Sequence, residues 1–178
     1  MERIFLIGYM GAGKTTIGKK LSKALALDFI DLDKYIQHTY QKSIHQLFEE
    51  KGEEGFRKIE QKALHEVAAF ENVVISCGGG TPCYFDNMEV MKKAGTTVYI
   101  QVDPEELANR LLASKTIRPL IAGKSREELI PFIDNQLRER ERYYNKADLV
   151  IKRDKLITKE DVYITVNQIA EQLKTRNK

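Results

Sequence analysis

A glycine-rich segment near the N-terminus constrains this chain more than any other feature. The apolar run Ile4–Ile7 ends at Gly8, and the sequence then reads Gly-Tyr-Met-Gly-Ala-Gly-Lys-Thr-Thr. A short apolar run that ends at glycine is typical of a strand buried on both faces. The segment 14–26 follows with a helical pattern, since its apolar residues fall on one face. A strand, a Gly-x-x-x-x-Gly-Lys-Thr loop and a helix in this order predict a phosphate-binding P-loop.

Each residue type in this loop has a physical reason. Glycines let the backbone wrap so that successive N–H groups point at phosphate oxygens, and the helix presents its positive N-terminal end to them. Lys14 would place a full charge on the β- and γ-phosphates, and the Thr15 hydroxyl would bind Mg²⁺. We therefore expect ATP or GTP together with Mg²⁺. The residues predicted to bind the nucleotide in this loop are Gly11, Ala12, Gly13, Lys14, Thr15 and Thr16.

The rest of the chain alternates strand patterns with helical patterns. Such alternation predicts βαβ units, a parallel sheet and helices on both of its faces. We therefore predict an α/β fold, namely a three-layer α/β/α P-loop NTPase fold with a five-stranded parallel sheet. Ligands in such folds bind at the carboxyl ends of the strands. The four further strands are expected at 29–31, 73–76, 97–102 and 149–151.

Composition narrows the class of protein. The chain has 178 residues, of which 42% are hydrophobic, with 29 Lys and Arg against 26 Asp and Glu. This length and apolar content suit one domain with its own core, and the balanced charge argues against disorder and against general nucleic-acid binding. No apolar stretch approaches the roughly 20 residues that cross a bilayer. Two cysteines, Cys77 and Cys83, and three scattered histidines do not make a zinc site. We expect a cytoplasmic protein with no membrane or nucleic-acid partner.

Two carboxylates follow the second predicted strand. Asp31 and Asp33 share one face if the segment is extended, so both can point into one crevice. No acidic residue follows the third strand, where ordinary P-loop ATPases carry one, so Asp31 becomes the second candidate metal residue beside Thr15. Asp33 could accept a proton from a substrate hydroxyl as a general base. Alternatively, Asp33 caps a helix and Asp31 is merely solvated.

Three consecutive glycines, Gly78, Gly79 and Gly80, follow the third strand. Such a run costs backbone entropy, which a ligand pressing against bare backbone would justify. A flexible loop is the alternative.

Arginines supply the remaining candidates. Arg57 precedes Glu60 by three residues, so the two can pair on a helix. Arg118 lies in an irregular segment that fits a lid carrying charge to a transferring phosphoryl group. Arg138, Arg140 and Arg142 alternate along a helical pattern, so at most one of them should point inward. Any single arginine among these could equally be solvated.

One motif points elsewhere. Asn145–Asp148 matches the Asn-Lys-x-Asp pattern that reads guanine in GTPases, but here it precedes a strand instead of following one. The Asp-x-x-Gly switch motif of those proteins is also missing. We therefore expect a small P-loop kinase acting on a small hydroxylated anion. A gluconate or nucleoside monophosphate kinase, or a nucleotide-binding module without catalysis, remains the alternative.

The order of these motifs is more specific than any one of them. Gly-x-x-Gly-x-Gly-Lys-Thr, Asp-x-Asp, Gly-Glu-x-x-Phe-Arg-x-x-Glu, Gly-Gly-Gly and Arg-Pro-Leu run from Gly8 to Leu120. In this order they resemble the shikimate kinase family. The resemblance implies one kinase domain over residues 1–178, with a helical substrate-binding insertion at about 33–62 and a lid at about 112–125. It further implies ATP-dependent phosphorylation of the 3-hydroxyl of shikimate, on the route to chorismate and aromatic amino acids, by a monomer.

The resemblance also assigns roles to particular residues. Lys14, Asp33 and Arg118 would be catalytic, and Arg118 would reach the phosphates when the lid shuts. Arg110 would stack on adenine. The residues that would bind shikimate are Asp33, Arg57, Gly78, Gly79, Gly80 and Arg140, the last chosen because it lies four residues before Tyr144.

Overall fold

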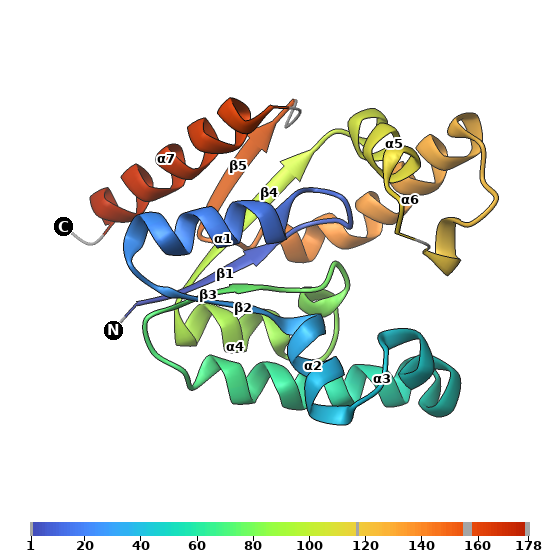
Figure 1. Ribbon diagram of the computed structural model, residues 1–178, viewed down its shortest axis with the longest axis horizontal. Coiled ribbons are helices and arrows are strands. Elements are labelled where there is room, and N and C mark those ends of the chain that lie inside the picture. Colours follow the sequence, from blue (N-terminus) through green and yellow to red (C-terminus); the bar gives the residue numbers. More distant parts are fainter. Residues whose placement is uncertain (1, 117, 155–157, 177–178) are drawn as a thin grey trace.

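A computed structural model describes residues 2–116, 118–154 and 158–176. Its centre is the predicted parallel sheet of five strands (Figure 1). The strands lie in the order β2-β3-β1-β4-β5. Each predicted strand is present, with bounds that differ from the expected ones by at most two residues. The strands are β1 (Arg3–Ile7), β2 (Asp28–Asp31), β3 (Val73–Ser76), β4 (Thr96–Val102) and β5 (Leu149–Arg153).

Strand β1 lies in the middle of the sheet because both of its faces are apolar. Ile4, Phe5, Leu6 and Ile7 are all fully buried. Leu6 pairs with Ser76 of β3 on one side and with Val98 of β4 on the other. A strand that is buried on both faces therefore delivers the glycine loop to the middle of the carboxyl edge.

Helices cover both faces of the sheet (Figure 1). Helices α1 (Lys14–Leu25) and α7 (Lys159–Arg176) lie side by side over one face, and α3 (Ile44–Ala68) and α4 (Asn87–Ala94) lie over the other. Helices α5 (Pro104–Ala113) and α6 (Arg126–Tyr144) pack together beside the carboxyl edge. The three-layer arrangement expected from the sequence is thus present. No helix among the described residues is long and apolar enough to cross a membrane.

Two helical segments project from the carboxyl edge opposite α5 and α6. Helix α2 (Leu32–Tyr40) begins where β2 ends, and the Asp31 side chain caps it by accepting a hydrogen bond from the Lys34 backbone N–H at 3.2 Å. Helix α3 is interrupted at Gly52, whose φ of 68° and ψ of 179° are not helical. The first part of α3 therefore bends away from the part that packs on the sheet.

Short 3-10 turns complete the same edge. Turn η1 (Thr81–Cys83) follows the glycine triplet, and η2 (Pro119–Ile121) lies in the irregular segment between α5 and α6. Residue 117 of the predicted lid lies outside the described residues. The carboxyl edge is therefore ringed by α2, α3, η1, η2 and α6.

Candidate active site

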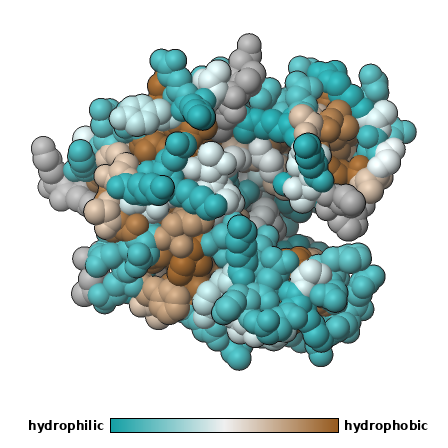
Figure 2. Space-filling model, viewed as in Figure 1, coloured by the Kyte–Doolittle hydropathy of each residue, from teal (hydrophilic) through white to brown (hydrophobic). Residues whose placement is uncertain are grey.

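One large cavity lies at the carboxyl ends of β1, β2 and β3. Its volume is about 1440 Å³, and the surface is hollowed between α2 and α3 on one side and α5 and α6 on the other (Figure 2). All but one of the residues assigned to the site from the sequence line it. The exception is Ala12, whose side chain is buried in the core. The assigned residues that line the cavity are Gly11, Gly13, Lys14, Thr15, Thr16, Asp31, Asp33, Arg57, Gly78, Gly79, Gly80, Arg110, Arg118 and Arg140.

The phosphate loop has the backbone that its glycines were expected to allow. Gly11 and Gly13 have φ values of 82° and 91°, which side chains rarely adopt. Gly8 combines a φ of 145° with close packing, because a Cβ there would lie 2.6 Å from the Ile100 carbonyl oxygen. The loop is thus held tightly against β4.

The Lys14 side chain turns back and binds the backbone of the phosphate loop. Its ammonium donates hydrogen bonds to the carbonyl oxygens of Gly8 at 2.7 Å and Tyr9 at 2.9 Å. Burial lowers the pKa of Lys14 to about 8, and the nearby Asp33 carboxylate opposes that shift. A phosphate that enters the loop would give this cation a stronger partner than two carbonyls.

The two candidate metal residues, Asp31 and Thr15, contact each other. The Thr15 hydroxyl donates a hydrogen bond to Asp31 Oδ2 at 2.9 Å. Both residues line the cavity beside the loop. This pair of hard oxygen ligands suits Mg²⁺, which keeps several waters and takes other ligands from phosphates. The described residues contain no group of three or more His, Cys, Asp or Glu that could hold a metal by itself.

Asp33 lies deeper in the cavity. Its pKa is raised to about 6, mainly by burial and also by the nearby carboxylates of Glu60 and Asp31, while the positive charges of Lys14 and Arg57 oppose the rise. A carboxyl group of this kind is still ionised near pH 7 but is more basic than an ordinary aspartate. It is therefore suited to accept a proton from a hydroxyl.

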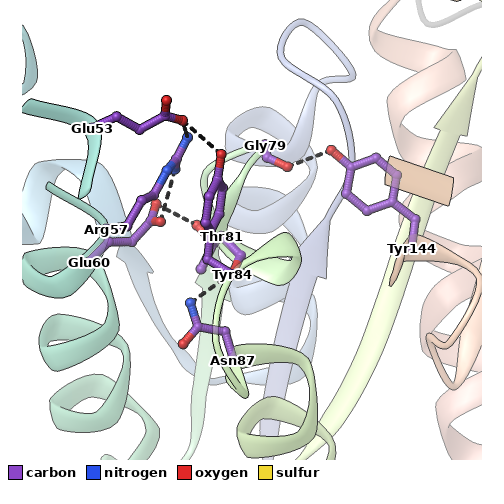
Figure 3. A network of polar contacts seen from close by, with 8 residues as sticks. All are labelled: Glu53, Arg57, Glu60, Gly79, Thr81, Tyr84, Asn87 and Tyr144. Carbon is purple, nitrogen blue, oxygen red and sulfur yellow. Dashed lines mark hydrogen bonds and ion pairs between the residues drawn. The ribbon is translucent and has the colours of Figure 1, made fainter. Parts of the chain in front are cut away.

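The buried Glu60 holds Arg57 as expected. Arg57 Nη1 lies 3.0 Å from Glu60 Oε1, and Thr81 donates a hydrogen bond to the other Glu60 oxygen at 2.8 Å (Figure 3). Arg57 Nη2 lies 3.7 Å from the exposed Glu53. A guanidinium fixed on one edge and open on another can hold a planar anion.

The glycine triplet brings bare backbone against three different candidate side chains. A Cβ at Gly78 would lie 3.4 Å from Asp33 Oδ1, and one at Gly79 would lie 3.2 Å from Arg140 Nη1. A Cβ at Gly80 would lie 2.7 Å from both terminal nitrogens of Arg57. Any side chain at Gly80 would therefore displace the Arg57 guanidinium.

Of the three alternating arginines, Arg140 lies deepest in the cavity. Its guanidinium carbon is 5.3 Å from the centre of the Tyr9 ring. Arg138 instead pairs with Asp134 on the surface and is 76% exposed, while Arg142 lies over the Tyr143 ring. Arg142 also lines the cavity, so two of the three arginines reach it, and the expectation that at most one would do so is wrong.

Arg118, in the predicted lid, and Arg110, which precedes it on α5, differ in their surroundings. Arg118 is close enough for its charge to shift the pKa of both Tyr9 and Lys14. Arg110 donates a hydrogen bond from Nη1 to the Gly11 carbonyl oxygen at 3.1 Å and pairs with Glu106 at 3.0 Å. Arg110 thus contacts the backbone of the phosphate loop. Its stacking on adenine stays a prediction.

The sequence and fold of this chain are similar to those of known shikimate kinases. The family model for shikimate kinase matches residues 10–174, which include the phosphate loop from Met10 onward, both aspartates, the glycine triplet and all the candidate arginines. The chain belongs to the shikimate kinase family. A shikimate kinase from Parabacteroides distasonis is 53% identical over 169 residues, which cover 95% of this chain and 98% of that protein. One from Phocaeicola vulgatus is 51% identical, covering 97% of this chain and 99% of that protein.

Solved shikimate kinases share the fold over nearly the whole chain. The crystal structure of the Bacteroides thetaiotaomicron shikimate kinase has a TM-score of 0.94 at 47% identity, covering 97% of this chain and 98% of that one. The Acinetobacter baumannii shikimate kinase, solved in complex with shikimate, has a TM-score of 0.87 at 29% identity, covering 99% and 94%.

Helix α6 makes contacts beside the shikimate kinase cavity that were not expected from the sequence. Tyr9 donates a hydrogen bond to Gln136 of α6, and Tyr144 of the same helix donates one to the Gly79 carbonyl oxygen at 2.5 Å. Gln136, Arg140 and Tyr144 follow one another at intervals of four, which places them on one face of α6. That face therefore holds the phosphate loop and the glycine triplet together. The spacing of four was the one signal in the sequence that could have indicated it.

Proposed function

We propose that this chain transfers the γ-phosphoryl group of ATP to the 3-hydroxyl of shikimate, giving shikimate 3-phosphate and ADP. One observation supports the proposal most strongly: two arginines and an aspartate whose pKa is raised lie in one cavity beside a phosphate loop. Arg57, Arg140 and Asp33 line the same cavity as Lys14. A small acid with hydroxyl groups fits this arrangement. Its product would enter the route to chorismate and the aromatic amino acids.

Substrate binding follows from charge and hydrogen bonding. Arg57 and Arg140 hold the shikimate carboxylate, since guanidinium groups pair with carboxylates through parallel hydrogen bonds. Glu60 keeps Arg57 in place. Asp33 accepts hydrogen bonds from the hydroxyls, and Gly78, Gly79 and Gly80 let the ring approach the backbone. These contacts fix the reacting hydroxyl toward the phosphate loop.

Phosphoryl transfer is in-line. The backbone N–H groups of the loop and the Lys14 ammonium hold the β- and γ-phosphates, and Arg118 adds positive charge from the lid. Asp33 positions the attacking hydroxyl and takes its proton as the new O–P bond forms and the bond to ADP breaks. Since charge develops on the γ-phosphoryl oxygens, fixed cations stabilise the transition state more than the ground state.

We also propose Mg²⁺ as the metal of this site, held by the Thr15 hydroxyl and, through a bound water, by Asp31. The ion would neutralise charge on the β- and γ-phosphates.

We expect Asp31→Asn to raise the Mg²⁺ concentration needed for half-maximal activity about tenfold, because the side chain that holds the metal-bound water loses its charge. A Mg²⁺ titration of initial rates measures this. Asp28→Asn, an exposed change at the start of the same strand, is the matched control. Equal Mg²⁺ requirements in both variants would remove Asp31 from the metal site.

A second prediction distinguishes Arg140 from Arg138 by the effect of each on the KM for shikimate. Arg140→Ala should raise the KM for shikimate at least about tenfold, because a charge-assisted hydrogen bond to the carboxylate is lost. Arg138→Ala removes the same side chain two residues away, where it is 76% exposed and paired with Asp134. Its KM for shikimate should stay at the wild-type value. Steady-state kinetics at saturating ATP give both values, and the reverse order would place Arg138 in the site.

The remaining elements of the proposal concern the whole chain. We propose one kinase domain with a substrate-binding insertion at about 33–62, a lid at about 112–125, and a monomer that works in the cytoplasm. The position of α2 and the first part of α3 across the cavity from η2 supports the insertion and the lid.

A parallel assay of ADP release tests the function. Purified enzyme is given ATP and Mg²⁺ with shikimate, quinate, gluconate or AMP. Release that depends on shikimate supports the proposal. Release with gluconate or AMP instead would make the chain a different small-molecule kinase, and ATP binding without release for any acceptor would make it a nucleotide-binding module.

A further inference from the structure

Tyr84, which belongs to none of the motifs of the site, contacts Arg57. It follows turn η1, between the glycine triplet and α4, and its half-buried ring lies against the Arg57 guanidinium with 4.2 Å between Arg57 Cζ and the ring centre (Figure 3). A cation at this distance over an aromatic face is attracted by the ring electrons. The planar guanidinium also stacks on such a face in a way that an ammonium cannot.

The Tyr84 hydroxyl makes a second connection. It donates a hydrogen bond to Glu53 Oε1 at 2.7 Å, and this same oxygen is the one that lies 3.7 Å from Arg57 Nη2. Glu53 belongs to α3, whereas Tyr84 belongs to the segment after β3. The contact therefore joins the helical segment that carries Arg57 to the loop that carries the glycine triplet.

Of the aromatic rings around the Arg57 guanidinium, Tyr84 is the nearest. Phe48 and Phe56 of α3 stack on each other at 4.2 Å, but their ring centres lie 5.8 Å and 5.4 Å from Arg57 Cζ. Glu60 fixes one edge of the guanidinium at 3.0 Å. The exposed Glu53 adds only a long contact, at 3.7 Å from Nη2, so the Glu60 edge and the Tyr84 ring face together define the plane of the guanidinium.

We infer that Tyr84 is a positioning residue, which orients the Arg57 guanidinium for the substrate carboxylate before the substrate arrives. A long arginine side chain loses rotamer freedom when it binds, and stacking in advance removes part of that cost from the binding step. The inference rests on the proposed function, because it takes Arg57 to be a carboxylate-binding residue. Tyr84 itself need not touch the reacting atoms.

The test compares two substitutions of the ring. Tyr84→Leu keeps an apolar side chain but removes the aromatic face, so the KM for shikimate should rise about tenfold, with kcat and the KM for ATP within about twofold of wild type. Tyr84→Phe keeps the face and loses only the hydroxyl bond to an exposed carboxylate, so its KM for shikimate should stay within about twofold. Tyr163→Leu, at a 63% exposed position on α7, is the matched control. KM does not depend on the fraction of enzyme that is folded, so partial unfolding of a variant would not mask the result.

A double-mutant cycle shows whether Tyr84 acts through Arg57. In an Arg57→Lys background, Tyr84→Leu should change the KM for shikimate by less than about twofold. A tenfold rise in both backgrounds would mean that the ring contacts shikimate by itself, and an unchanged KM in Tyr84→Leu would mean that it positions nothing. Either result overturns the inference while wild-type turnover of shikimate remains intact. Absence of that turnover would instead contradict the proposed function.

Discussion

Replacing Asp33 by asparagine is expected to lower kcat by about 10³-fold while the Kd for ATP stays within about twofold. General-base catalysis typically contributes roughly 10²–10⁴-fold, and asparagine keeps the size of the side chain but cannot accept the proton. Asp33 lines the cavity outside the phosphate loop, so the loop is untouched by the change. Stopped or coupled assays give kcat, and calorimetry with a non-hydrolysable ATP analogue gives the Kd.

The same substitution should stabilise the fold at alkaline pH. The pKa of Asp33 is raised from 3.8 to about 6 in the folded protein, so the folded state binds a proton more readily than the unfolded chain. The charged carboxylate therefore destabilises the protein fully above about pH 6, and this penalty disappears as the pH falls below about 4. A neutral asparagine side chain at this position carries no such penalty. We expect Asp33→Asn to gain about 1–3 kcal/mol at about pH 8 and nothing at about pH 4.

Thermal unfolding at the two pH values measures this pair of outcomes. A rise in Tm of several degrees at alkaline pH, together with lost turnover, is the signature of a residue kept for its chemistry at the expense of stability. Near-normal turnover would show that Asp33 is not the base. A loss of stability at alkaline pH would show that its carboxylate is compensated by its surroundings, contrary to the burial described above.

Replacing Arg57 by alanine is expected to raise the KM for shikimate about 100-fold and to destabilise the protein by about 3 kcal/mol. The first effect is the loss of charge-assisted hydrogen bonds to the carboxylate, each of which contributes about 1.5–3 kcal/mol. The second arises because the Glu60 side chain, only 2% exposed, loses its cation. Steady-state kinetics and denaturant unfolding measure the two effects separately.

A second substitution distinguishes binding from folding at this position. Arg57→Ala combined with Glu60→Gln removes the orphaned charge, and glutamine can still accept the hydrogen bond from Thr81. Most of the stability should return, but the KM for shikimate should remain high. If the KM recovers with the stability, Arg57 supports the structure of the site and does not bind the carboxylate.

Much of this molecule could be predicted because local patterns and tertiary structure agree. The buried run Ile4–Ile7 is apolar on both faces, which suits a central strand of a parallel sheet. Gly52 interrupts an otherwise helical pattern and has the only non-helical backbone inside α3. The phosphate loop follows from spacing alone, since its geometry requires glycines at fixed places.

Other parts of the site were not predictable because they depend on contacts between distant segments. Nothing near Tyr84 in the sequence indicates that its ring stacks on Arg57, which lies far earlier in the chain on a bent helix. The hydrogen bond from Tyr9 to Gln136 likewise spans 127 positions. The alternative interpretation of the two aspartates, in which Asp33 caps a helix and Asp31 is merely solvated, is wrong, because Asp31 caps α2 and Asp33 lies in the first turn of that helix.

The product of the reaction tests the central claim most directly. The enzyme is incubated with ATP, Mg²⁺ and shikimate, and phosphorus–proton correlation spectra locate the transferred phosphoryl group. We predict a single new phosphate coupled to the proton on the carbon that bears the 3-hydroxyl, formed in proportion to ADP and abolished by Asp33→Asn. A phosphate on another hydroxyl, or ADP formed without any phosphorylated shikimate, would contradict the account.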